Sequence, residues 1–293
     1  TMNSFIQRLN AGEILAADGA TGTNLHQMGL TPGVPPEELV LEQPHLLVSL
    51  ASAFVEAGSN IILTCTFGAT AMRLKESRYA DRIVEINTRA VELAKQAAAL
   101  RNGVLVAGSI GPTGSLIQPY GPASPEEVSA SFNEQAAALV KAGVDLLVIE
   151  TMFSIEEAAL AFEAAKQAGK IPVVVSFSYD RGVRTMMGVK PAQVMTFFAE
   201  RGAAAVGANC GTSLENMEKI VQEYAATRPG FPIWAKPNAG LPRMDEDNLA
   251  VYDLLPEEMG KAACRYVELG ARIVGGCCGT TPAHVAEIAR AIR

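Results

Sequence analysis

Residues 145–178 read DLLVIETMFSIEEAALAFEAAKQAGKIPVVVSFS, and they contain the repeating unit from which the fold is inferred. Apolar runs within 145–151 and 171–178 have the length of buried strands. Between them, apolar residues recur at three- and four-residue spacing, which is the period of an α-helix. The stretch therefore predicts a strand, a helix and a second strand, with the two strands parallel and buried on both faces.

The same alternation extends over the rest of the chain. Further predicted strands lie at 13–20, 60–68, 104–111, 204–211, 232–240 and 272–279. Helical segments separate the strands, with N-cap residues predicted at Ser124, Ser154 and Thr281 and with glycines where the helices stop. Eight strands alternating with helices over 293 residues predict an α/β fold, a closed (β/α)8 TIM barrel in one domain, residues 1–293. An open, doubly wound sheet is the alternative.

Composition narrows the range of partners. The net charge is −7 and the chain has no dense block of Lys or Arg, which argues against nucleic acid and against an anionic membrane surface. No apolar run reaches the length of about 18 residues that a membrane span needs, and the N-terminal stretch lacks the features of a secretory signal. We therefore expect a soluble, cytoplasmic protein that acts on a small molecule.

The five cysteines point to metal binding or redox chemistry. Their number is odd and they are spread over a long chain, which does not resemble the disulfide framework of a secreted domain. In a TIM barrel the active site lies at the C-terminal ends of the strands, where the βα loops converge. The residues that end the predicted strands include Asp18, Cys65, Glu150, Cys210, Asn238, Cys277 and Cys278. We expect them to meet there.

Three of these cysteines, Cys210, Cys277 and Cys278, predict a zinc site. Three thiolates leave one tetrahedral position open, which is typical of a working site. Adjacent cysteines on a regular strand point to opposite faces, so the strand must break at the pair, and the glycines around it permit this. Such a zinc carries negative charge and suits thiol alkylation better than the production of hydroxide.

Less specific interpretations of the cysteines stay open. The adjacent pair could be two small apolar residues or a strained vicinal disulfide, and Cys210 could be a buried thiol without chemistry. Cys65 is interpreted as lining of the site, and Cys264 is explained by packing on the apolar face of a helix. The three histidines fall in a loop or at helix starts, which disfavours a His-rich zinc hydrolase.

Two acidic residues are candidate substrate contacts. Glu150 follows an apolar run, where a carboxylate needs a cation, either a substrate ammonium group or an internal salt bridge. Asp18 begins DGATGTN, in which Gly19 and its small neighbours let backbone N–H groups approach a substrate carboxylate. A tight turn capped by Asp18 is the alternative.

The motifs DGATGTN, TCTFGAT, GSIGPTG, VIET, GANCGT, KPNAG and GGCCGTTPAHV occur in this order over nearly the whole chain. In order and spacing they resemble the homocysteine S-methyltransferase family, and within it the homocysteine-binding domain of cobalamin-dependent methionine synthase. The resemblance implies a (β/α)8 barrel and zinc bound by Cys210, Cys277 and Cys278, with the homocysteine sulfur as fourth ligand. It also implies that Asp18, Gly19 and Glu150 hold the amino acid end of homocysteine, with Asn238 nearby.

The sequence departs from this pattern at two places. Cys65 stands where relatives often have Asn, and the loop after PNAG lacks the usual Gly-x-x-x-Tyr spacing. Both departures bear on the choice of substrate or methyl donor.

The expected function is zinc-dependent methylation of homocysteine, bound as a thiolate, to methionine. The chain shows no corrinoid or folate motif, so the donor is expected to be external. Methylcobalamin on a separate corrinoid- or folate-binding domain or protein is the candidate. An alternative is methyl transfer between a different thiol, or a corrinoid protein, and a donor at the same zinc site. A barrel that binds zinc without turnover is disfavoured by the open ligand position.

Overall fold

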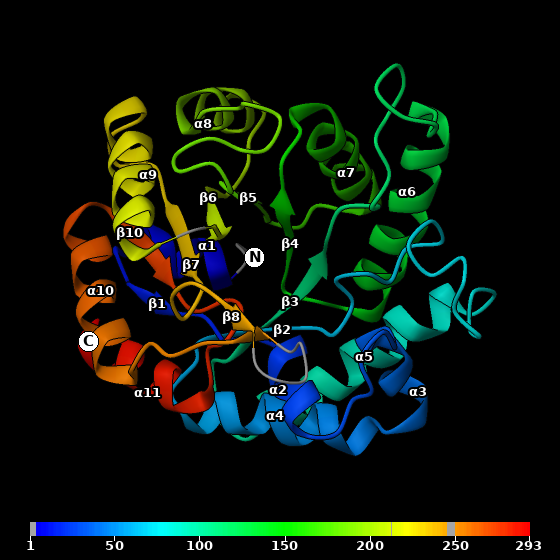
Figure 1. Ribbon diagram of the computed structural model, residues 1–293, viewed down its shortest axis with the longest axis horizontal. Coiled ribbons are helices and arrows are strands. Elements are labelled where there is room, and N and C mark those ends of the chain that lie inside the picture. The colour runs from blue at the N-terminus through cyan, green and yellow to red at the C-terminus, as the bar shows by residue number, and fades with distance from the viewer. Residues whose placement is uncertain (1–3, 212, 245–249) are drawn as a thin grey trace.

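A computed structural model describes residues 4–211, 213–244 and 250–293. Eight parallel strands form one sheet in the order β1-β10-β7-β6-β5-β4-β3-β2. A parallel bridge between Ala17 and Ile61 joins the two ends of this sheet. Helices surround the strands on the outside (Figure 1). The prediction of a (β/α)8 barrel is confirmed, and the open-sheet alternative is wrong.

Each barrel strand overlaps one of the predicted segments. The strands are β1 (Leu15–Ala16), β2 (Ile61–Leu63), β3 (Leu105–Ile110), β4 (Leu146–Met152), β5 (Val173–Phe177), β6 (Ala205–Cys210), β7 (Ile233–Pro237) and β10 (Ala271–Val274). The short strands β1 and β10 end just before the motifs that carry Asp18 and the cysteine pair. The loops after these strands therefore start at the same end of the barrel.

The helices of the βα units are α2 (Gly22–Gln27), α3 (Leu39–Glu42), α4 (Pro44–Glu56), α5 (Ile83–Ala98), α6 (Pro125–Ala142), α7 (Ile155–Ala168), α8 (Pro191–Glu200), α9 (Leu214–Thr227), α10 (Pro256–Glu268) and α11 (Pro282–Ala291), with a 3-10 turn, η1 (Pro36–Glu38). The predicted N-caps are confirmed: Ser124 and Ser154 accept hydrogen bonds from the backbone three residues on, and Thr281 precedes α11. Gly143 ends α6 with φ +86°, a conformation that favours glycine.

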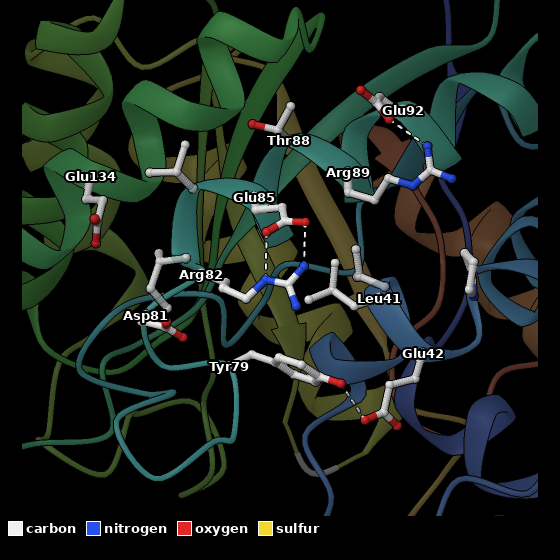
Figure 2. Close-up of a pocket in the computed structure, with 14 residues that line it drawn as sticks. Leu41, Glu42, Tyr79, Asp81, Arg82, Glu85, Thr88, Arg89, Glu92 and Glu134 are labelled. Carbon is white, nitrogen blue, oxygen red and sulfur yellow. Dashed lines mark hydrogen bonds and ion pairs between the residues drawn. The ribbon is translucent and has the colours of Figure 1, made fainter.

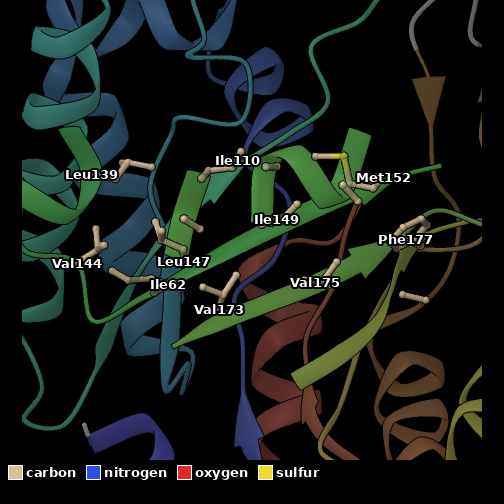
Figure 3. Packing of buried hydrophobic residues seen from close by; sticks show 14 of the residues in the cluster. Ile62, Ile110, Leu139, Val144, Leu147, Ile149, Met152, Val173, Val175 and Phe177 are labelled. Atoms are coloured by element: carbon tan, nitrogen blue, oxygen red, sulfur yellow. The ribbon is translucent and has the colours of Figure 1, made fainter. Parts of the chain in front are cut away.

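Two apolar layers result from the alternation of side chains along each strand. In β4, Leu146 and Val148 point into the barrel interior, where they pack with Trp234. Leu147 and Ile149 belong to the other layer, which includes helix residues such as Leu139 of α6; Figure 3 draws part of this layer. Helix α1 (Ser4–Asn10) contributes the fully buried Phe5 to the interior layer. The N-terminal end is thus packed with side chains, and polar groups collect at the opposite end.

The stretch 241–259 has the most irregular sequence of the chain, which predicts an extended loop before the next helix. Instead, β8 (Arg243–Met244) and β9 (Ala250–Val251) pair antiparallel, and α10 begins at Pro256. Residues 245–249 of this stretch lie outside the described residues. Within the described residues, no helix combines the length and the apolar character needed to cross a membrane.

Candidate metal centre and substrate cavity

Three thiols from two distant parts of the chain meet at the C-terminal end of the barrel. Cys210 is the last residue of β6, and Cys277 and Cys278 follow the end of β10. The Cys210 sulfur lies 2.7 Å from the Cys277 sulfur and 3.9 Å from the Cys278 sulfur. All three sulfurs lie within 4.8 Å of one another. The expected convergence of these strand ends is therefore observed.

The backbone after β10 turns sharply, which lets two adjacent cysteines face the same point. The Cys277 N–H donates to the Pro237 carbonyl at 2.7 Å, and the Thr280 N–H donates back to the Cys277 carbonyl at 3.1 Å. Gly279 takes φ +79°, which a residue with a side chain adopts only with strain. Cys210 itself has φ +55°, so β6 also turns at its thiol.

The donor set fits zinc. Four ligands at about 2.3 Å in a tetrahedron place sulfurs about 3.8 Å apart. The 3.9 Å separation of Cys210 and Cys278 matches that edge, and the 2.7 Å separation of Cys210 and Cys277 would have to widen by about 1 Å. All five cysteines are free thiols, and 2.7 Å exceeds a disulfide bond of about 2.05 Å. Among the described residues the cluster has three ligands, which leaves a fourth position open.

Hydrogen bonding distributes charge unevenly over the three thiols. Hydrogen bonds to Cys277 and Cys278 raise the pKa of Cys210 well above its ordinary value. The pKa of Cys278 is lowered because it accepts hydrogen bonds from Cys210 and Cys277, and Tyr252 lowers it further.

A buried acid–base group lies beside the thiols. The Lys236 ammonium on β7 donates to the Asp18 carboxylate at 2.6 Å, and both side chains are nearly inaccessible to solvent. The other Asp18 oxygen accepts from the Leu63 N–H at 2.7 Å. Asp18 is therefore held by an internal ion pair, beyond the simple turn cap considered from the sequence. Lys236 was missed, although a lysine within the apolar run PIWAKPNAG is a signal that could have been used.

Glu150 is a second buried acid, and it lines the cavity. Its carboxylate accepts from the Ser109 hydroxyl at 2.6 Å, and no cation lies within ion-pair distance of it in the described part of the chain. Burial raises the pKa of Glu150 to about 7, although the nearby charge of Lys236 acts in the opposite direction. For Lys236, burial alone would lower the pKa, but Asp18 and Glu150 raise it above its ordinary value.

Gly19 and Asn238, the other candidate substrate contacts, occupy different places. Gly19 lines the cavity, and a Cβ atom at this position would meet the Phe54 ring at 2.7 Å. The Asn238 side chain donates to the Gly211 carbonyl at 3.2 Å and does not line the cavity. Asn238 therefore supports the loop that follows Cys210.

The remaining cysteines and histidines behave largely as expected. Cys65 lines the cavity outside the three-sulfur cluster, and Cys264 in α10 donates to the Ala291 carbonyl. His284 caps α11 and His45 is exposed on α4. His26 bonds to the Leu30 carbonyl and forms part of the cavity wall.

A cavity of about 620 Å³ opens over the thiols. Its wall includes the three cysteines, Ser109, Glu150, Lys236, Phe67 and Arg73, together with residues 19–23 and 33–37. A separate depression of about 880 Å³ lies on the outer surface beside α3, α4 and α5. There the charged groups bond to one another, as the Arg82–Glu85 and Arg89–Glu92 pairs do in Figure 2. Only the first cavity brings together potential metal ligands and a free buried acid among the described residues.

Comparison with known proteins gives one consistent family. A sequence model described as homocysteine S-methyltransferase matches residues 15–292. Methionine synthase from Mycobacterium tuberculosis is 29% identical over 95% of the chain, which corresponds to 24% of that protein. Betaine–homocysteine S-methyltransferase 1 from Rattus norvegicus is 30% identical, with 97% of the chain and 74% of the relative covered. The chain thus spans about a quarter of the mycobacterial methionine synthases that it matches.

Solved structures agree with the sequence matches. The metallated form of the homocysteine methyltransferase MmuM from Escherichia coli superposes with a TM-score of 0.83 at 25% identity. The match covers 98% of this chain and 99% of that one. The likeness therefore extends over the barrel and its loops.

Proposed function

The chain belongs to the homocysteine S-methyltransferase family, and from that premise we propose that it methylates the sulfur of homocysteine to give methionine. Zinc held by Cys210, Cys277 and Cys278 is the proposed cofactor. The observation that carries this proposal is the convergence of three thiols within 4.8 Å at a cavity that also contains the buried Glu150, which has no ion-pair partner among the described residues. We further propose that residues 1–293 act as a single homocysteine-binding domain, which the match over 15–292 supports.

Each end of homocysteine has a proposed partner in the cavity. Zinc on three thiolates would hold the substrate thiol deprotonated and nucleophilic at neutral pH. The substrate ammonium group is assigned to Glu150, which has no competing cation within ion-pair distance among the described residues. Backbone N–H groups of residues 21–23, which follow Gly19 in the cavity wall, are assigned to the substrate carboxylate, since the Ala20 N–H already donates to Thr280.

The reaction requires little further chemistry from the protein. The thiol proton is released to solvent, the new S–CH3 bond forms, and the donor leaves with the electron pair of its broken methyl bond. The protein fixes the acceptor sulfur and holds the two ends of homocysteine, so that the substrate does not rotate in the cavity. Methionine has a neutral thioether, which is a weak metal ligand and can depart.

The methyl donor is assigned to the part of the cavity that homocysteine does not fill. Cavities of about 300–1,000 Å³ hold drug-sized ligands, so homocysteine leaves much of the 620 Å³ free. A corrinoid protein or domain carrying methylcobalamin is the proposed donor, supported by the match to methionine synthases. The rat relative is named for betaine instead. Supplying each donor separately with homocysteine, and measuring methionine formed, decides between them.

The acceptor chemistry is tested by zinc content and zinc-edge X-ray absorption with and without homocysteine. Wild type should hold about one zinc per chain, with three sulfur ligands that become four when homocysteine is added. Cys277→Ala should lose most of the zinc. Cys264→Ala is the matched control, because that thiol lies in α10 outside the cluster, and it should behave as wild type. If wild type lacks zinc, or if its sulfur count ignores homocysteine, the proposal is wrong.

A further inference from the structure

The buried side chain of Asn209 contacts both the strand that carries Glu150 and the loop that carries Cys277. Asn209 precedes Cys210 in β6 and is fully buried. Its Oδ1 accepts from the Thr151 N–H at 2.8 Å and from the Ser176 hydroxyl at 2.7 Å. Its Nδ2 donates to the Thr151 hydroxyl at 2.7 Å and lies 3.8 Å from the Cys277 sulfur, within hydrogen-bond range for sulfur. A single side chain therefore contacts β4, β5 and the loop after β10.

The backbone is unusual at two places, and Asn209 is joined to both. Among the described residues, the non-glycine residues with positive φ are Thr151 at +59° and Cys210 at +55°. Thr151 forms two hydrogen bonds with the Asn209 side chain, donating its N–H to Oδ1 and accepting from Nδ2 at its hydroxyl, and Cys210 follows Asn209 in the chain. Such conformations persist only where surrounding contacts impose them, and they concentrate at functional sites.

The turns at Thr151 and Cys210 orient the Glu150 carboxylate and the Cys210 thiol, to which the proposed function assigns roles. The pairing of β4 with β5 shifts register between Ile149 and Met152, so the strand is irregular at Glu150 and Thr151. The turn at Cys210 brings its sulfur next to the Cys277 sulfur. Both Glu150 and Cys210 line the cavity, one for the substrate ammonium group and one for the metal.

We infer that Asn209 is a positioning residue that sets the spacing between the substrate's ammonium partner and the metal-binding thiols. It fixes the turn after Glu150 through Thr151 and restrains the Cys277 sulfur through its amide N–H. This inference rests on the proposed function. It assigns no contact with substrate to Asn209, which acts through the residues that it holds.

The contacts of Asn209 suggest variants that separate its effect on Thr151 from its effect on Cys277. Asn209→Asp keeps an acceptor for the Thr151 N–H and Ser176 but removes both donated bonds. Thr151→Val removes only the hydroxyl that Asn209 reaches, and Thr151→Ser keeps it. Asn87→Asp is the matched control, since Asn87 is also fully buried and donates two amide bonds, to the Ala69 and Ile83 carbonyls, away from the thiols.

The measurements are zinc affinity by chelator competition, the KM for homocysteine, kcat and thermal stability, all on the full chain. Loss of partners that orient metal ligands typically costs 10–100-fold in affinity, and we expect a loss of about that size in Asn209→Asp. Thr151→Val should keep zinc affinity within about twofold, raise the KM for homocysteine about tenfold, and be rescued by Thr151→Ser. Asn87→Asp should change thermal stability alone.

Two results would overturn the inference. The first is that Asn209→Asp keeps the zinc affinity and the KM of wild type. The second is that its losses merely match those of Asn87→Asp. If Asn209→Asp does not fold, the comparison of Thr151→Val with Thr151→Ser decides, because an unchanged KM in both contradicts the coupling. Failure of the proposed function is seen separately, as a wild-type zinc site that does not respond to homocysteine.

Discussion

The carboxylates of Asp18 and Glu150 lie at the same end of the barrel, and the position of Lys236 gives them different roles. Asp18 takes the lysine as an ion-pair partner at 2.6 Å, which compensates both buried charges. Glu150 accepts from the Ser109 hydroxyl and has no ion-pair partner among the described residues, and burial raises its pKa. A substrate ammonium group would supply the missing cation, which is why Glu150 is the better candidate for that contact.

This difference predicts how homocysteine binding depends on pH. Because burial raises the pKa of Glu150 to about 7, the carboxylate takes up a proton as the pH falls through this value and loses its attraction for the ammonium group. We expect the advantage in KM of wild type over Glu150→Gln to be full above about pH 8 and to fall up to tenfold per pH unit below 7. Steady-state kinetics of both proteins across this range measure it. A ratio that stays constant with pH would contradict the assignment, and any pH effect on the thiol cancels in the ratio.

At the residue scale, the sequence predicted where the site residues lie better than it predicted which residues they contact. The meeting of Cys210, Cys277 and Cys278 follows from their place at strand ends in a barrel, whereas their role as zinc ligands stays a prediction. Lys236 stands out as a lysine within an apolar run, but its pairing with Asp18 could not be predicted. Asn209 was missed because a polar residue inside a strand acquires meaning only when its partner on another strand is known. The positive φ of Cys210 has no signal in the sequence, since tertiary contacts impose it.

At the scale of elements, β6 carries a thiol to the site only because it lies very close to β7. A Cβ atom on Gly207 would stand 1.8 Å from the Trp234 carbonyl oxygen. Glycine is therefore required for the β6–β7 pairing, and this pairing runs to Cys210 and Pro237 at the strand ends. The position of the thiol depends on a residue three positions earlier.

Gly207→Ala should consequently destabilise the barrel by about 3 kcal/mol, the upper end of the usual range, because the clash is with backbone and no side chain can move aside. Gly22→Ala is the control for stability. No atom lies within 4 Å of a Cβ at that position and its φ is not positive, so a change within about 1 kcal/mol is expected. Urea unfolding of both variants measures the difference. Equal midpoints would show that β6 and β7 can separate at little cost.

Element existence was predicted well, and the exceptions have a physical reason. The eight barrel strands are apolar runs buried on both faces, and the helix caps at Ser124, Ser154 and Thr281 carry local signals. The hairpin of β8 and β9 was missed. Its strands are two residues each, too short for any periodic pattern, and they lack the buried apolar run that marks the barrel strands.

At the scale of the whole molecule, Asp18 contributes to closing the barrel. It lies at the end of β1, accepts from the Leu63 N–H at the end of β2, and pairs with Lys236 on β7. Regular pairing between β1 and β2 is limited to the single bridge of Ala17 with Ile61. The side chain of Asp18 therefore supplements a seam where the backbone ladder is short.

Removing one partner of this pair should cost far more than removing both. Asp18→Asn keeps an acceptor for Leu63 but leaves the Lys236 ammonium buried without its ion pair, and a loss of about 3–5 kcal/mol in the free energy of unfolding is expected. Adding Lys236→Met replaces the stranded charge with an apolar side chain of similar length. The double variant should recover at least half of that loss, because the desolvation penalty of the charge disappears with it. Urea unfolding of the two single variants and the double variant gives the coupling energy, and strictly additive losses would mean that the two groups do not depend on each other for stability.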